Sequence, residues 1–107
     1  MADTHKLPPM SDEDRARALE QAAAARRRRA EIKALLKTGS LTLAEVFEEA
    51  ERDDIVAGTK VFPLLSSMPR MGKIKAIRTM EELGIPENRK IRGLGSRQRA
   101  DLLARFA

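Results

Sequence analysis

The 107-residue sequence contains no cysteine, tryptophan or tyrosine and only one histidine, and these absences exclude several classes of function. Without cysteine the chain can form neither a disulfide bond nor a conventional structural zinc site. The single histidine, His5, lies near two prolines at the start of the chain, so no catalytic dyad or triad based on histidine or cysteine can be assembled. A phosphate loop of the GxxxxGK[ST] type is also missing. We therefore expect a protein that is not an enzyme and has no cofactor, metal or small-molecule substrate.

Long apolar stretches are absent as well. No run approaches the length of a membrane span, and the first ten residues, MADTHKLPPM, lack the apolar centre of a signal peptide. We expect residues 1–10 to be a disordered lead-in, because neighbouring prolines cannot enter a helix interior. The remaining chain suits one small domain with a modest core, in a cytoplasmic protein that has no membrane partner.

Positive charge is plentiful but unevenly distributed. The chain has 21 Lys and Arg against 16 Asp and Glu, a net charge of +5. From residue 60 onward there are eleven basic and four acidic residues, whereas residues 1–59 contain ten and twelve. An excess of cations in one half of a chain favours a polyanion as the partner.

The hydrophobic pattern predicts helices throughout and no strand. A capping pair of Ser11 and Asp14 begins a long helix over residues 11–38, and Gly39 suits its C-terminal cap. This helix would be roughly 40 Å long, and its alanine-rich middle has little apolar surface, so we expect part of it to project into solvent. The residues expected to dock it on the core are Ile32, Leu35 and Leu36.

Four shorter helices are predicted over the remaining residues, 40–107. The first begins at a capping box of Thr42 and Glu45 and carries an acidic face that extends to Asp54; the others cover about 60–67, 73–83 and 96–106. Gly84 suits a Schellman cap at the end of the third. The expected core positions are Leu43, Val46, Phe47, Ala50, Val61, Phe62, Leu64, Leu65, Ile74, Ala76, Ile77, Met80, Leu83, Ala100, Leu103 and Phe106. The fold class is thus all-α.

The segment MPRMGKIK, between two of these helices, is a candidate phosphate site. A helix N-terminus presents unpaired N–H groups and a partial positive charge, and Gly72 would let a phosphate approach them beside Lys73 and Lys75. An ordinary turn explains the local pattern about equally well.

Two further basic clusters are candidates for nucleic-acid contact. Arg89, Lys90 and Arg92 lie in a connector beside Gly93 and Gly95, where a solvated loop is the alternative reading. The second cluster lies on the long helix, where successive side chains point 100° apart, so at most about two of its members could meet one duplex. Its members are Arg26, Arg27, Arg28 and Arg29. Arg78 is less informative, because an ion pair with Glu82 would explain it equally well.

The order of three segments, ALEQAAAARRRRAEIKALLK, MPRMGKIKAIRTMEELGI and RKIRGLGSRQRADLL, resembles the actinobacterial integration host factor family from about residue 8 onward. The resemblance implies a long N-terminal helix followed by a small helix–two-turn–helix domain of a type also found in a ribosomal protein. It further implies a nucleoid-associated protein that binds duplex DNA with little sequence preference and bends or compacts it to support recombination, replication or transcription. Arg70 departs from the family pattern, since related hairpins often have glycine there.

The resemblance also assigns DNA-contacting residues. The family's contact turn corresponds to Met68, Pro69, Arg70, Met71, Gly72, Lys73, Ile74 and Lys75, and the family's basic trio to Arg89, Lys90 and Arg92. Arg26–Arg29 would form a second surface, on the same duplex or on another. Double-stranded DNA is therefore the expected partner of a monomeric protein. The alternatives are a structured-RNA binder and a module that binds an acidic protein.

Overall fold

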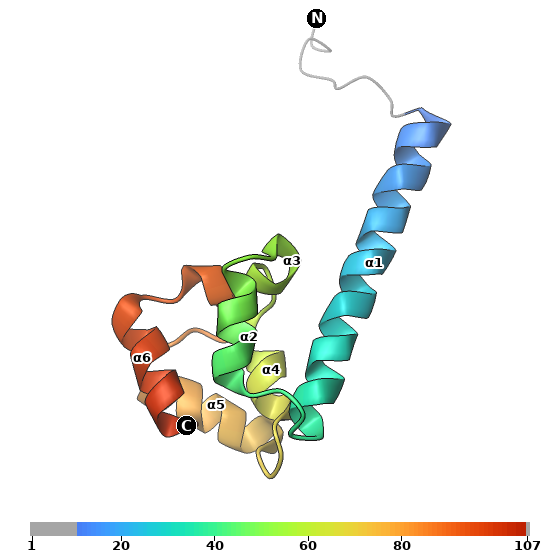
Figure 1. The fold of residues 1–107 in the computed structure, drawn as a ribbon. Coiled ribbons are helices and arrows are strands. Elements are labelled where there is room, and N and C mark those ends of the chain that lie inside the picture. The colour runs from blue at the N-terminus through green and yellow to red at the C-terminus, as the bar shows by residue number, and fades with distance from the viewer. Residues whose placement is uncertain (1–10, 107) are drawn as a thin grey trace, which may run out of the picture.

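The computed structural model describes residues 11–106, which fold into helices as the sequence predicts (Figure 1). The expected lead-in, residues 1–10, lies outside the described residues. The helices, in chain order, are α1 (Asp12–Lys37), α2 (Leu43–Ala50), α3 (Asp54–Ala57), α4 (Val61–Ser67), α5 (Gly72–Glu82), the short 3₁₀ helix η2 (Ile91–Gly93) and α6 (Ser96–Arg105).

The first helix, α1, leans away from a small domain built by the other helices (Figure 1). Its start is capped by Ser11, whose hydroxyl accepts a hydrogen bond from the backbone N–H of Asp14 at 3.0 Å. Its end is a Schellman motif at Gly39, which has φ +76°. Only Ile32 and Leu36 of α1 are buried, so the rest of the helix extends away from the core.

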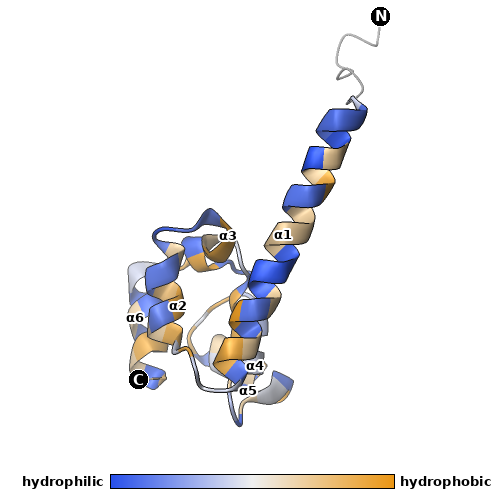
Figure 2. Ribbon diagram, turned by 45° about the vertical axis from the view of Figure 1, so that its right-hand side comes forward, coloured by the Kyte–Doolittle hydropathy of each residue, from blue (hydrophilic) through white to orange (hydrophobic). Residues whose placement is uncertain are grey.

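The core is formed mainly by α2, α4 and α5, and it is completed by Ile32 and Leu36 of α1, Val56 of α3, Ile91 of η2 and Leu102 of α6. Figure 2 shows hydrophobic residues on the helices that surround it. The predicted positions of α2 and α4 are confirmed, with three residues of each helix fully buried: Leu43, Val46 and Phe47, then Val61, Leu64 and Leu65. The capping box of Thr42 and Glu45 and the Schellman cap at Gly84 are also present. The domain is thus held by the contacts that the hydrophobic pattern indicates.

Three of the expected core positions are wrong. Ile74 is 73% exposed, because the whole first turn of α5 lies outside the core. Leu35 is 36% exposed, and on α6 the exposed Ala100 gives way to Leu102, which is fully buried. The predicted Leu103 and Phe106 are partly buried and pack against the core. Arg99, one turn before Leu102, places its guanidinium over the Phe47 ring at 5.0 Å, so part of the inward face of α6 is formed by a cation that the hydrophobic pattern does not indicate.

The segment after α2 also differs from the expectation. The acidic face does not continue to Asp54, because α2 ends at Ala50 and Asp53 caps a separate short helix, α3. The Asp53 carboxylate accepts a hydrogen bond from the backbone N–H of Ile55 at 2.9 Å. Val56 of α3 is fully buried. A four-residue helix has too few positions to show a periodic pattern, so α3 could not be predicted from hydrophobic periodicity.

Among the described residues, no helix combines the length and the apolar character that crossing a membrane requires. Nor do three or more His, Asp or Glu side chains in residues 11–106 come together in a group that could hold a metal ion.

Candidate nucleic-acid interface

The turn between α4 and α5 is held in an uncommon backbone conformation. Met71 donates its N–H to the carbonyl of Met68 at 3.1 Å, and Arg70 between them has φ +66°. With Pro69 before it, Arg70 occupies the position of a type II turn that usually requires glycine. A non-glycine residue in this left-handed region costs roughly 1–2 kcal/mol. Met68 and Met71 pack against the core, and this packing keeps the strained turn in place.

The start of α5, directly after this turn, carries positive charge without compensation. Gly72 has φ +68°, no side chain caps the helix, and its first turn contains no acidic residue. Gly72, Lys73 and Lys75 are exposed, and the Lys75 ammonium donates to the Arg70 carbonyl at 3.2 Å. The free N–H groups of a helix start and two adjacent cations together favour the approach of an anion. We call Arg70, Lys73 and Lys75 the turn cluster.

The connector between α5 and α6, residues 85–95, does not present its three cations equally. The Arg89 guanidinium donates to the Gly93 carbonyl at 3.0 Å and to Oε1 of Gln98 at 2.9 Å. A Cβ at Gly93 would lie 3.0 Å from Cδ of Arg89, so the glycine makes room for this side chain. Arg89 is therefore half-buried and braces the loop, whereas Lys90 and Arg92 are exposed.

The connector and the turn cluster lie at opposite ends of α4. Val61, the first residue of α4, donates its N–H to the Arg89 carbonyl at 2.9 Å, and Ile91 donates to the Thr59 carbonyl at 3.0 Å. These bonds make Lys60 and Lys90 directly opposite residues in an isolated antiparallel bridge. Ile91 is buried and fixes the connector against the core. Because α4 has seven residues, the two basic groups are separated by a helix roughly 10 Å long.

The four arginines of α1 have different surroundings. Arg26 and Arg27 are exposed, but Arg28 is surrounded by carboxylates. Its partners are Glu31 at 2.6 Å, Asp53 at 3.4 Å and Glu49 at 3.8 Å. The hydrogen bond to Glu31 raises the pKa of Arg28, with a further contribution from Asp53. Arg28 thus ties α1 to α2 and α3.

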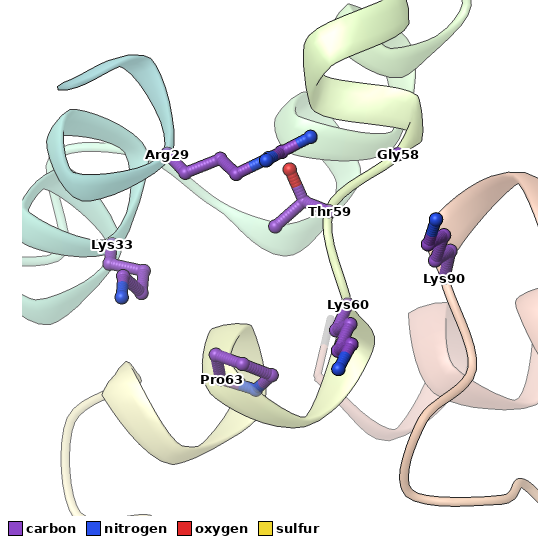
Figure 3. A pocket seen from close by; sticks show the side chains of 7 residues that line it. All are labelled: Arg29, Lys33, Gly58, Thr59, Lys60, Pro63 and Lys90. Atoms are coloured by element: carbon purple, nitrogen blue, oxygen red, sulfur yellow. The ribbon is translucent and has the colours of Figure 1, made fainter. Parts of the chain in front are cut away.

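Arg29 points the other way, into a cavity of about 350 Å³ between α1 and the junction of α3 and α4 (Figure 3). Its guanidinium reaches toward Thr59, Lys33 lies one turn further along α1, and Lys90 lies on the opposite side of the cavity. The cavity is lined by Arg29, Lys33, Gly58, Thr59, Lys60, Pro63 and Lys90. Arg29, from the predicted second surface, and Lys90, from the connector, therefore line the same cavity.

Sequence reasoning missed Lys33 and Lys60 as members of this group. The spacing of Arg29 and Lys33, four residues apart on a helix, would have placed both on one face. Nothing in the sequence indicated that Lys60 faces Lys90, because this pairing arises from contacts between residues 30 positions apart.

The last helix uses its arginines differently. Arg99 donates to the Phe47 carbonyl at 3.1 Å and lies 3.9 Å from Glu51, so it joins α6 to α2. Arg105 forms an ion pair with Glu82. The alternative reading of Arg78 as the partner of Glu82 is therefore wrong.

Comparison with known proteins agrees with this architecture. Residues 36–106 match the family model of the S13-like H2TH domain. The integration host factor of Mycobacterium tuberculosis is 51% identical over 100 residues, covering 94% of this chain and 95% of the relative. That of Streptomyces coelicolor is 50% identical and covers 94% of both chains.

A solved structure adds the spatial comparison. It is described as sIHF bound to an 8bp palindromic DNA, is 48% identical in sequence and superposes with a TM-score of 0.79. The match covers 82% of this chain and 99% of the solved chain. On these similarities the chain belongs to the integration host factor family of actinobacteria, whose fold is a long N-terminal helix joined to an S13-like H2TH domain.

Proposed function

We propose that the chain is a nucleoid-associated architectural protein that binds duplex DNA with little sequence preference. The observation that carries this proposal is the start of α5, where an uncapped helix end without acidic residues stands beside exposed lysines. Backbone N–H groups and lysine ammonium groups contact phosphates well, and phosphate contacts carry no sequence information directly. The solved relative described as bound to DNA supports duplex DNA as the ligand.

The distance between the turn cluster and the exposed connector cations, Lys90 and Arg92, would allow both to contact one duplex. The turn cluster lies after α4, and Lys90 and Arg92 lie beside its start, roughly 10 Å away along the helix axis. This distance is well within one turn of B-form DNA, about 34 Å. The turn cluster would hold phosphates while Lys90 and Arg92 enter or straddle the minor groove, which attracts cations most strongly where it is narrow.

The projecting helix supplies the architectural part of the proposal. Arg26 and Arg27 are exposed on α1, outside the H2TH domain, so a duplex that meets them as well as the turn cluster would have to bend. A second duplex held by these arginines would instead be bridged to the first. Either action would place the protein at the nucleoid, in support of recombination, replication or transcription.

The proposal is tested by fluorescence anisotropy with two duplexes of unrelated sequence and equal length, and with a structured ribosomal RNA fragment as competitor. We expect similar affinities for the two duplexes and weak competition by the RNA. Competition by RNA at concentrations equal to those of the duplex would assign the domain to RNA binding instead. No retention of either nucleic acid would leave an acidic protein as the partner and contradict the proposal.

A further inference from the structure

The cavity beside α1 is surrounded by cations that no carboxylate neutralises. Its lining includes Arg29, Lys33, Lys60 and Lys90, and no acidic residue. None of these four side chains forms an ion pair with another residue in the described part of the chain. The neighbouring acid Asp53 is already engaged, with Arg28 and with the N–H of Ile55. A cavity lined by four cations and no acidic residue has a positive potential that favours an anionic ligand.

The backbone holds two of the lysines together. Lys60 and Lys90 are opposite each other in the antiparallel bridge, between the two hydrogen bonds that flank it. In such a pair the Cβ atoms are about 4.5–5.5 Å apart, so the two stems leave the backbone side by side. Because the bridge anchors the connector to α4, this juxtaposition is built into the fold.

The arginines converge on the same place. A Cβ at Gly58 would lie 3.4 Å from a terminal nitrogen of Arg29 and 3.5 Å from one of Arg92, so both guanidinium groups approach the bare glycine backbone. The Nε of Arg29 is buried and has no hydrogen-bond partner among residues 11–106. Leaving such a donor unpaired is unfavourable, and a charge-assisted hydrogen bond from the same guanidinium to an anionic oxygen would offset this cost.

We propose that this cavity is a phosphate-binding site, in which Arg29 and Lys33 of α1 and Lys60 and Lys90 of the domain hold the phosphate of an esterified ligand. At about 350 Å³ the cavity is larger than one phosphate group needs and has the size of a small ligand pocket. The phosphate belongs either to the DNA backbone or to a free nucleotide. Only the first source rests on the proposed function. In both cases the ligand fixes α1 against the domain, since its contacts come from both (Figure 3).

The test is a titration of the full chain with inorganic pyrophosphate at constant ionic strength, followed by NMR of the Gly58 and Thr59 amides. We expect saturable shifts of both signals. Lys33→Gln should weaken the binding about tenfold, the usual effect of losing a charge-assisted hydrogen bond. Lys60→Gln should act in the same direction, and it provides an independent readout if Lys33→Gln perturbs the fold. Lys37→Gln is the matched control, one turn further along α1 and outside the cavity, and should bind as the wild type does.

A second arm identifies the source of the phosphate. If it belongs to DNA, a saturating duplex abolishes the pyrophosphate shifts, and Lys33→Gln lowers the salt slope of DNA binding by about 1. If it belongs to a free nucleotide, pyrophosphate still binds in the presence of duplex and the salt slope is unchanged. Shifts that do not saturate, or that are equal in Lys33→Gln, Lys60→Gln and Lys37→Gln, would overturn the proposal. This titration uses free protein, so its failure is separate from a failure of DNA binding.

Discussion

Two regions of the molecule, the side around α2 and the two ends of α4, differ in whether their cations have carboxylate partners. Around α2, arginines are surrounded by carboxylates: Arg28 contacts three of them, and Arg99 contacts Glu51 and the Phe47 ring. At the ends of α4, the turn cluster and Lys90 have no carboxylate partner among the described residues. The first arrangement joins helices to one another, and the second leaves cations available to a ligand. The number of arginines in a segment is therefore a weaker indication of nucleic-acid binding than whether acidic side chains lie within ion-pair distance of them.

The largest effect is expected at the start of α5. The double change Lys73→Gln and Lys75→Gln should lower DNA affinity on the order of 50-fold at 0.1 M salt, since each lost phosphate contact removes about 0.9 from the log–log salt slope. Fluorescence anisotropy measures this. The matched control is Arg52→Gln with Arg97→Gln, which removes the same charge next to Glu49 and Asp101. Equal losses of affinity in the two double variants would mean that net charge alone determines DNA binding. Such a result would contradict a special role for cations without carboxylate partners.

A smaller effect is expected in the connector. Arg92→Ala should weaken binding about tenfold, and by the same factor on duplexes of unrelated sequence, because a groove or phosphate contact does not read bases. Parallel titrations on two duplexes give the two factors. A loss confined to one sequence would show that Arg92 reads a base edge.

On the side around α2 the expected effect is on stability. Arg28→Ala should lower the free energy of unfolding by about 1 kcal/mol, because it leaves three carboxylates facing one another. Urea denaturation measures the change, with Arg27→Ala as the control, since Arg27 is exposed. DNA affinity should change little in Arg28→Ala. A strong loss of affinity at unchanged stability would place Arg28 with the DNA-contacting cations.

Effects on stability of similar or smaller size are expected in the turn itself. Arg70→Gly should stabilise the fold by about 0.5 kcal/mol, because relief of the left-handed strain exceeds the entropy cost of glycine. Gly72→Ala should destabilise it by about 1 kcal/mol for the same conformational reason, although a Cβ there meets no atom within 4 Å. Thermal unfolding of the two variants gives opposite shifts. Shifts of the same sign would contradict the two positive φ values.

Features of the fold that depend on neighbouring residues could be predicted from the sequence, and those that depend on distant contacts could not. Local signals worked: the capping box at Thr42 and the Schellman cap at Gly84 depend on residues within one turn. Two features of the fold could not be predicted from the sequence. The four residues of α3 show no period, and part of the inward face of α6 is formed by Arg99, which packs on Phe47, 52 positions earlier.

The candidate site shows the same limit. The turn sequence and the basic trio could be found from residues 68–75 and 89–92, but their different environments could not. The Arg89 brace, the Arg28 ion pairs and the meeting of Arg29 with Lys90 all depend on tertiary contacts. Which cations a fold neutralises is decided by packing between distant segments, and a single sequence does not contain that packing in readable form.

We propose that cations without carboxylate partners at the ends of α4 hold DNA phosphates. The most direct test is the dependence of DNA affinity on salt, measured for the wild type, for Lys73→Gln with Lys75→Gln, and for Arg52→Gln with Arg97→Gln. We predict that the first pair lowers the log–log slope by about 1.8 and that the second leaves it unchanged. A slope that is flat in the wild type, or that falls equally in both double variants, would contradict the account.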